Sequence, residues 1–598
     1  MASRMMRVIG HWEFLKRTRM HRLAALHKII AKQKGRLVTA LVALQNEFCA
    51  IHVARLQMLH GKPRKSHRRI RMMAFRNLIL GSVAGLLAIG GVQAADLPVK
   101  AKAVEYVRIC SLYGAGFFFI PGTDTCIKLG GYLRVDTTFN GGIQGQPAWN
   151  GDLGQQNRYR DYFASRSRMA LTVDTRTATE YGVVRTFMQA DFQFNTLGGS
   201  TFNPNSINVT SPVGGVQLLD TPGGGYVAVE SVFIQFAGFT FGKSSSAYAT
   251  PWNGFPGNIS SYLLGGHNTD TGVNNVQYTA QFGNGVSGTI GLDDPTVWNR
   301  TAVYNLSLPL NATLNSGNAY AGVHAPDVVG NIRVDQAWGL FQISAAAHEV
   351  SGSYNVLNTA AVPAGATGLA GAAPTALSEI NGHPETKWGG SVMAGLNIKN
   401  LPTGAGDDIK IDASYAKGDT KNVIATASTS PSFAMFSGTG RAGAYESIGF
   451  GATTDGVWLP AANGGDGAIH LTTAYGMRGA FNHNWDAHWS SSLFGSYSAV
   501  RYDNVAKTNI CTNYTTPAKA VSADFTCNPD FNVSQLGVIT RWAPVKNLTF
   551  SAELMWFHLD QKFTGAATLG ATAPKPAAVY AFKDQDAISL QLRAQRNF

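Results

Sequence analysis

The sequence predicts an all-β protein, a 16-stranded antiparallel transmembrane β-barrel with long extracellular loops and short periplasmic turns. Three observations predict this fold. Segments of about ten residues alternate between apolar and polar side chains, the links between them alternate between short and long, and the chain ends on such a segment, AISLQLRAQRNF. In this last segment five apolar residues share one parity and only Arg596 breaks the pattern: Ile588, Leu590, Leu592, Ala594 and Phe598.

The N-terminal part of the chain is typical of targeting sequence rather than of the barrel. Four arginines precede an apolar run over 78–92, which ends in Val-Gln-Ala. We therefore expect a secretory signal peptide over 72–94, cleaved after Ala94. A membrane-anchoring helix is the alternative, but the run is short for a span and is interrupted by glycines.

Residues 1–71 are strongly basic, with 17 Lys and Arg against two acids. We interpret this extension as a start codon assigned too early. The alternative is a genuine basic arm for nucleic acid or a membrane surface. Without the extension and the signal, the chain from residue 95 onward has a net charge of −3. The basic character of the whole sequence therefore says nothing about what the mature protein binds, and we expect no nucleic-acid partner.

The exported chain retains four cysteines, Cys110, Cys126, Cys511 and Cys527, in two pairs that are each 16 residues apart. Two local disulfides are the simplest interpretation of an even count in an exported protein. The first pair belongs to a mature N-terminal segment, 95–126, that precedes the barrel, 127–598. A four-cysteine metal site normally uses close Cys-x-x-Cys pairs, which the sequence lacks. We expect neither a metal nor a cofactor.

The alternation predicts sixteen strands, with boundaries good to a few residues. They are expected near 127–139, 163–175, 181–194, 226–238, 239–249, 273–282, 285–293, 327–337, 339–350, 387–398, 408–417, 469–481, 488–501, 532–542, 548–559 and 585–598. Short links such as TRTATEY, GNG, WG and APVKN alternate with long ones. An up-and-down barrel has tight turns at one rim and long loops at the other, so it predicts this rhythm.

A secreted β-sandwich or adhesin is the alternative to the barrel. It explains the alternation of side chains but not the strict alternation of short and long links. The polar parity includes charges in many strands, and no separate apolar segment is available to fill the centre. We therefore expect the apolar face to meet lipid and the polar face to line a lumen, with the last strand closing against the first.

Enzymatic motifs are weak in this sequence. AGFTFGKS, from Ala237 to Ser244, matches a loose phosphate-loop pattern, but it continues a strand pair where a real phosphate loop leads into a helix. The sequence has neither Gly-x-Ser-x-Gly nor His-Glu-x-x-His. We name no catalytic residue.

A basic cluster and one long link are the candidate functional elements. The lumen-facing parity of the first three strands carries four arginines, Arg134, Arg166, Arg168 and Arg185. The link TPWNGFPGNISSYLLGGHNTDTG, over 250–272, is apolar and turn-rich, as expected of a loop folded inward to narrow a pore. Its candidate residues are Trp252, Asn253, Phe255, His267 and Asp270. Charged linings and a narrow passage set size and ion preference in channels.

The chain closely resembles the alphaproteobacterial general porin family from about Ala95 to Phe598. Four blocks occur in order: ICSLYGAGFFFIPGTDTCIKLGGYLRVD, SRMALTVDTRTATEYGVVRTFMQADF, FIQFAGFTFGKS and PDVVGNIRVDQAWGLFQISAAAHEV. The resemblance implies a homotrimer of sixteen-stranded barrels in outer-membrane lipid and lipopolysaccharide. It also implies that the four arginines form a basic wall, that residues 250–272 form the constriction loop opposite, and that the barrel-assembly machinery recognises Phe598.

These observations favour a passive channel of a Gram-negative outer membrane, through which small hydrophilic solutes and ions diffuse. The alternatives are a solute-selective channel, a non-conducting surface adhesin, and an enzyme on a barrel scaffold. Conductance in a pure bilayer separates the channels from the other two classes.

Overall fold

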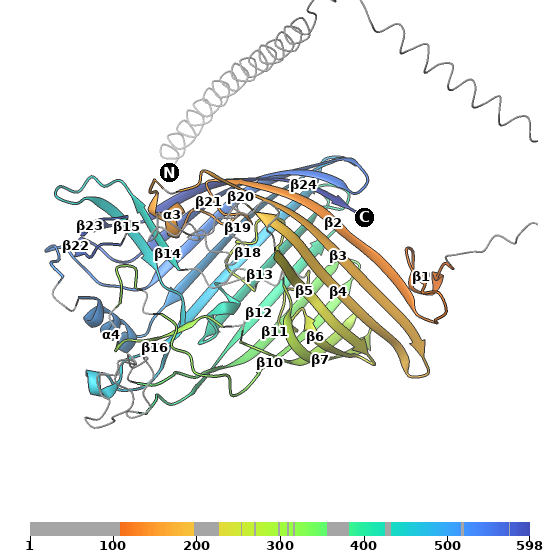
Figure 1. Cartoon of the computed structure of the whole chain (residues 1–598), viewed down its shortest axis with the longest axis horizontal. Helices are drawn as coiled ribbons and strands as arrows, with labels where there is room; N and C mark the ends of the chain where they lie inside the picture. The colour runs from red at the N-terminus through yellow and green to blue at the C-terminus, as the bar shows by residue number, and fades with distance from the viewer. Residues whose placement is uncertain are drawn as a thin grey trace, which may run out of the picture. The chain divides into compact units, whose positions relative to one another are not determined.

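The computed structural model describes residues 108–158, 160–195, 226–252, 254–267, 271–296, 300–307, 310–314, 317–355, 382–424, 432–515, 519–572 and 574–598. The segments 1–71 and 72–94, predicted as an extension and a signal peptide, lie outside these residues. The described chain is dominated by long antiparallel strands (Figure 1).

Sixteen of the described strands form one closed antiparallel barrel, as the sequence predicts. In chain order they are β2 (Cys126–Phe139), β3 (Phe163–Thr179), β4 (Gly182–Asn195), β5 (Tyr226–Phe236), β6 (Phe239–Ser244), β7 (Val273–Gly283), β8 (Val286–Asp293), β10 (Asp327–Gln336), β11 (Gly339–Val350), β12 (Lys387–Lys399), β13 (Asp408–Lys417), β18 (Thr473–Asn484), β19 (Trp489–Arg501), β20 (Phe531–Val545), β21 (Leu548–Gln561) and β24 (Gln585–Asn597). Each strand pairs with the next, and β24 pairs with β2.

The two faces of the barrel wall differ as the alternation predicts. Leu133, Ile332 and Leu536 point outward and expose 53, 63 and 53% of their surface. Asp136 and Glu553, of the opposite parity, expose 0 and 1%. The outer surface is therefore apolar where lipid would cover it, and charged side chains are enclosed by the wall.

The barrel closes at the last residue of the chain. The Phe598 amide donates to the Gly131 carbonyl at 3.1 Å, and the Gly131 amide donates to the Phe598 carbonyl at 3.2 Å. Gly131 has a φ of 150°, and a Cβ there would lie 2.0 Å from the Ala170 carbonyl oxygen. Only glycine allows this close approach, so the seam depends on a glycine at position 131.

β3 continues four residues beyond the expected 163–175, and two strands are shorter than the expected 239–249 and 469–481. β6 ends at Ser244, because residues 247 and 249 turn inward and accept hydrogen bonds from side chains of β10 and β11. β18 begins at Thr473, because residues 470–471 pair with another strand, β16, as the short strand β17. At both of these shortened ends the alternation of apolar and polar residues continues in the sequence, although the backbone no longer pairs with a neighbouring barrel strand.

Each cysteine pair forms the expected disulfide. Cys110 joins Cys126, which ties the η1 helix (Ser111–Tyr113) and β1 (Phe118–Phe119) to the start of β2. Cys511 joins Cys527 beyond the opposite ends of the strands. A loop of this size contributes about 3 kcal/mol by restricting the unfolded chain.

The long loops fold into a structure that the sequence analysis did not predict, here called the loop cap. It gathers at one end of the barrel strands (Figure 1). Its elements are α3 (Gly151–Gln155), β9 (Ala302–Asn305), β14 (Phe433–Ser437), β15 (Glu446–Gly451), β16 (Thr454–Trp458), β17 (His470–Leu471), α4 (Asn504–Thr515), β22 (Ala566–Leu569) and β23 (Ala578–Phe582). Among the residues described, no helix has the length and apolar character needed to span a membrane.

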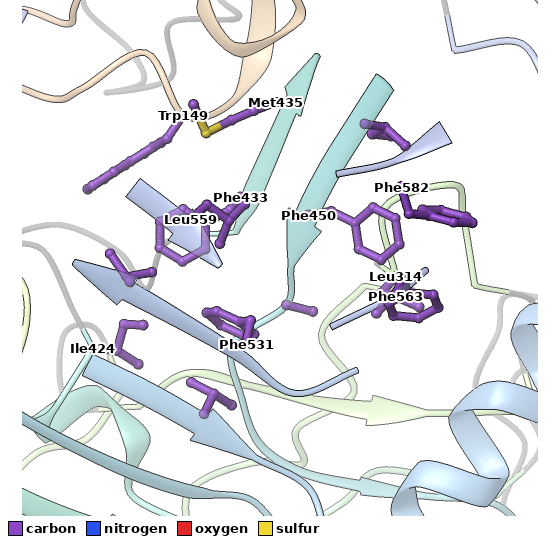
Figure 2. Packing of buried hydrophobic residues seen from close by; sticks show 14 of the residues in the cluster. Trp149, Leu314, Ile424, Phe433, Met435, Phe450, Phe531, Leu559, Phe563 and Phe582 are labelled. Atoms are coloured by element: carbon purple, nitrogen blue, oxygen red, sulfur yellow. The ribbon is translucent and has the colours of Figure 1, made fainter. Parts of the chain in front are cut away.

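Aromatic packing joins the loop cap to the barrel. Phe433 of β14 contacts Phe531 of β20 and Phe557 of β21, with ring centroids 5.6 Å apart in both pairs. Figure 2 shows Phe433 and Phe531 together with Phe450 and Phe563, whose ring centroids lie 4.9 Å apart. Each fully buried aromatic of this kind contributes roughly 1.5–3 kcal/mol. Apolar side chains from many loops, rather than one apolar segment, therefore fill this part of the barrel mouth.

Deleting Phe598 is expected to lower the fraction of folded barrel, because it removes both backbone hydrogen bonds that close the seam at Gly131. The folded fraction is measured as the heat-modifiable band in electrophoresis of unheated samples. Phe598→Tyr, which retains the backbone and the ring, should fold like the wild type. Equal folded fractions for the deletion and the wild type would contradict a role in closure.

Candidate functional site

Residues 245–252, 254–267 and 271–272, the described part of the segment between β6 and β7, lie inside the barrel and are here called the inner loop. Its backbone carbonyls accept hydrogen bonds from inward side chains on five strands of the wall. The donors are Asn331 and Arg333 of β10, Gln342 of β11, Arg478 and Asn482 of β18, Gln535 and Arg541 of β20, and Arg593 of β24. The loop therefore crosses the lumen and is held by its backbone.

Glu553 of β21 anchors the middle of the inner loop. Its carboxylate accepts the Ile259 amide at 2.5 Å and the Ser260 amide at 3.1 Å. Two arginines flank it: Arg541 donates to the Gly257 carbonyl, and Arg593 donates to the Ile259 carbonyl at 3.3 Å. A buried carboxylate with two amide donors and two nearby guanidiniums is well compensated, because charge-assisted hydrogen bonds are the strong ones.

Arg478 and Gln535 hold the C-terminal half of the inner loop. Arg478 pairs with Asp412 at 2.9 Å and donates to the His267 carbonyl at 2.6 Å. Gln535 donates to the Tyr262 carbonyl at 2.9 Å and accepts the Leu264 amide at 2.8 Å. Both side chains are almost fully buried, so this half of the loop is fixed against β18 and β20.

Direct backbone contact between the loop and the wall requires a glycine at Gly476 of β18. A Cβ at this position would lie 2.8 Å from the Cα of Gly265 in the loop. Real Cβ atoms do not approach another carbon so closely. The wall is therefore shaped to let the loop backbone lie flush against it.

The wall opposite β10 to β13 carries three of the four predicted arginines in two cross-strand rows. Arg134 of β2 lies opposite Arg168 of β3, and Asp136 lies between Arg166 of β3 and Arg593 of β24. The Arg166 Nε atom lies 3.0 Å from the Asp136 carboxylate. The structure thus brings Arg134, Arg166 and Arg168 together, with a carboxylate among them.

These arginines differ in how far nearby carboxylates compensate their positive charge. Arg168 forms ion pairs with Asp191 at 2.5 Å and with Glu230 at 3.5 Å, and Arg166 pairs with Asp136. Arg134 donates to Gln595 at 2.8 Å and lies 4.3 Å from the Tyr132 ring centroid. Within the described residues no carboxylate forms an ion pair with Arg134, which is also partly exposed. Arg134 is the member of the row whose charge is least cancelled.

Arg185 lies apart from the other three arginines. It faces Arg176 across the β3–β4 pair, eight residues along β3 from Arg168. At about 3.3 Å per residue, this separation is about 26 Å. Arg185 and Arg176 both pair with Asp174, at 3.0 and 3.1 Å, near the tight turn that joins the two strands. The structure therefore places Arg185 at the turn end of the barrel.

Of the predicted loop residues that the structure describes, Trp252 and Phe255 are partly buried and His267 is buried. The Trp252 indole donates to the Gly254 carbonyl at 3.2 Å, and the Phe255 ring lies 5.5 Å from the Arg478 guanidinium carbon. His267 is 4% exposed, and its Nδ1 lies 2.6 Å from Asn422 Oδ1. Burial lowers the pKa of His267 to about 4, so the imidazole is neutral at pH 7. Asn253 and Asp270 lie outside the described residues.

The sequence analysis did not single out the residues that hold the loop, Glu553, Arg541, Arg593 and Arg478. Each lies in an expected strand or at its edge and points inward. A charged side chain that faces the lumen from a membrane strand needs a partner. The position of these four charges on the inward face of the alternation is the signal that could have identified them. The partner is the loop backbone for several of them, and no sequence pattern marks a backbone carbonyl.

The described residues can be compared with two other kinds of site, a metal centre and a phosphate loop. Among the residues in the described ranges, no group of three or more His, Cys, Asp or Glu side chains is placed to hold a metal ion. The AGFTFGKS segment forms the β5–β6 hairpin and the strand β6, with positive φ at Ala237 and Gly238 in the turn. It has the geometry of a hairpin rather than of a phosphate loop.

Comparisons of the sequence with a family model and with known proteins point to the same family. A family model described as the porin subfamily matches residues 96–591. Porin Omp2b of Brucella abortus (strain 2308) is 31% identical over 274 residues, covering 45% of this chain and 64% of that protein. Porin Omp2b of Brucella suis is 31% identical over 272 residues with the same coverage. The chain therefore spans less than two thirds of the length of the curated relatives it matches.

Among solved structures, the outer membrane channel DcaP of Acinetobacter baumannii is similar over 80% of this chain and 99% of that one. Its sequence identity is 15% and the TM-score is 0.48. An anion-selective porin from Comamonas acidovorans is similar over 79% of this chain at 9% identity, with a TM-score of 0.35.

Replacing Glu553 by Gln is expected to loosen the inner loop. The side-chain amide keeps one acceptor oxygen but turns a donor toward the second loop amide, a loss of about 1–3 kcal/mol. Hydrogen exchange at Ile259 and Ser260 should accelerate accordingly. Glu349→Gln is the matched control, because the Glu349 carboxylate accepts the backbone amides of His324 and Ala325 elsewhere. Unchanged exchange at Ile259 and Ser260 in Glu553→Gln would show that Glu553 is not the anchor.

Proposed function

Because the chain belongs to the porin subfamily, we propose that it forms a passive, water-filled channel through which small hydrophilic solutes and ions diffuse. The observation that carries the proposal is a closed barrel with an apolar outer face and charged side chains on its inner face, around a loop that crosses the lumen. A wall built only to bury a core would not place Asp, Glu and Arg on its inner parity along so many strands.

The chain is an outer-membrane protein that crosses the membrane with sixteen strands. Every backbone group in the hydrocarbon region must be paired, and the closed barrel satisfies this requirement. The family is one of channels. The proposed function adds that the chain carries out no covalent chemistry and uses no cofactor.

The inner loop narrows the passage in the proposed channel, and the arginines of β2 and β3 form its charged wall. Arg134 sets the ion preference more strongly than Arg166 or Arg168, because the latter two are paired with carboxylates. Arg185 contributes to the field at the turn end rather than at the narrowest point. The described loop residues add little charge of their own, because His267 is neutral at pH 7.

The proposal includes an assembly and a route to it. Three copies associate in outer-membrane lipid with lipopolysaccharide around them, and the barrel-assembly machinery recognises the terminal Phe598. Residues 72–94 direct export and are removed. Residues 1–71 are not part of the functional protein. These parts of the proposal rest on the sequence pattern and on the family.

Replacing Arg134 by Gln should shift the reversal potential of the wild-type channel toward cation preference, measured in a planar bilayer across a salt gradient. It removes the arginine charge in this row with which no carboxylate of the described residues forms an ion pair. Arg185→Gln is the control: it removes the same charge about 26 Å away along the strand, more than the Debye length of about 10 Å at 0.1 M salt. Equal shifts for both variants would remove the charged-wall assignment, and absence of any current from folded wild-type protein would contradict the channel itself.

A further inference from the structure

Asp455 of β16 is a fully buried carboxylate in the loop cap that the proposed permeation path does not use directly. Its Oδ2 atom accepts the Thr301 amide at 2.7 Å and the Tyr320 hydroxyl at 2.9 Å. Its Oδ1 atom accepts the Thr420 amide at 2.8 Å and the Thr420 hydroxyl at 2.9 Å. A carboxylate has about four acceptor positions, so Asp455 uses its full capacity to join two loops, the one between β8 and β10 and its own loop between β13 and β18.

The same carboxylate is connected to the barrel wall. The His348 Nε2 atom on β11 lies 3.9 Å from Asp455 Oδ2 and 3.0 Å from the Tyr320 hydroxyl. The His348 Nδ1 atom lies 2.7 Å from Asp327, the first residue of β10. His348 and Asp455 are both 0% exposed. Asp455 therefore fixes the loops relative to the wall rather than only to one another.

From Thr420 the connection continues to the inner loop. Thr420 begins a short 3-10 helix, η5 (Thr420–Asn422), whose Asn422 side chain lies 2.6 Å from the Nδ1 atom of His267. The next residue, Val423, accepts the Gly265 amide at 3.0 Å, and Ile424 forms a parallel bridge with Gly266. Residues 419–424 thus lie between Asp455 and residues 265–267 of the inner loop.

Resting on the proposed channel function, we propose that Asp455 is a positioning residue for the permeation path. By holding Thr420 it fixes residues 419–424, and these fix residues 265–267 of the inner loop. The position of the loop cap therefore sets the position of the constriction. The inner loop also has its own attachments to the wall, through Arg478 and Glu553. Loss of the Asp455 contact is therefore expected to loosen the channel without unfolding the barrel.

Thr420 offers a matched pair of variants for the test. Its side chain is 0% exposed, and its hydroxyl lies 2.9 Å from Asp455 Oδ1 and 3.0 Å from the Thr454 carbonyl oxygen. Thr420→Val keeps the shape and removes the hydroxyl, whereas Thr420→Ser keeps the hydroxyl and removes a methyl group. Asp524→Asn is a control elsewhere in the loops, because Asp524 is 61% exposed and pairs with Arg441.

The experiment records single-channel current of the mature full-length protein and its variants in a planar bilayer. Thr420→Val and Asp455→Asn should spend on the order of tenfold more time outside the main open level, because a hydrogen bond to a buried charge shifts a two-state population by about that factor. Thr420→Ser and Asp524→Asn should match the wild type. If Asp455→Asn fails to give a heat-modifiable barrel, the Thr420 pair alone decides.

A double-variant cycle separates positioning from general loosening. His267→Ala breaks the contact with Asn422, so Thr420→Val should add less current noise in that background than in the wild type. The proposal would be overturned if the current traces of Thr420→Val matched those of Thr420→Ser and the wild type. It would also be overturned if the effects of Thr420→Val and His267→Ala were fully additive. A silent wild type would instead contradict the proposed channel function, which distinguishes the two failures.

Discussion

A single constraint governs the whole barrel: every backbone amide and carbonyl that faces hydrocarbon must find a partner within the sheet. An open sheet of sixteen strands leaves two unpaired edges, and the structure removes both by pairing β24 with β2. The seam extends to the last residue, where Phe598 and Gly131 exchange backbone hydrogen bonds. Closure also fixes which parity faces inward, and with it the positions of all the charged side chains on the wall.

Once the wall is closed, its inward charges must be compensated in a confined space. Wall carboxylates pair with several of the arginines, such as Asp136 with Arg166 and Arg593, and the loop backbone accepts hydrogen bonds from others, such as Arg541. Compensation by backbone explains why the described part of the loop needs few acidic residues of its own. Many charged side chains of the wall therefore both hold the loop and shape the electric field in the lumen. A substitution that tests the field must be made at a side chain that does not also hold the loop. Arg134 is useful in this respect because its removal leaves no ion-paired carboxylate behind.

Much of the barrel could be predicted from the sequence, because period-two alternation and the rhythm of the links directly reflect a two-faced wall. The prediction was wrong at residues 245–249 and 469–472, where alternation continues although the backbone leaves the barrel. The loop cap could not be predicted: its strands, such as β14 and β16, are five residues long, which is too short to show a period, and some pair with strands distant in sequence, as β16 does with β9. Within the site, the basic residues of β2 and β3 followed from parity. Arg185 shares that parity, but only the strand register reveals that it lies far from the others. The partners of Glu553 and Arg541 are backbone groups, which carry no residue identity.

The most direct test of the central claim, a water-filled passage for small hydrophilic solutes, is the swelling of liposomes that contain the refolded chain from residue 95 to 598. The account predicts swelling in uncharged sugars at rates that fall steadily with molecular size and are equal for stereoisomers of one size. Absence of swelling from protein verified as folded would contradict the passage and favour an adhesin or an enzyme on a barrel scaffold. A strong preference between stereoisomers would contradict passive diffusion and favour a solute-selective channel.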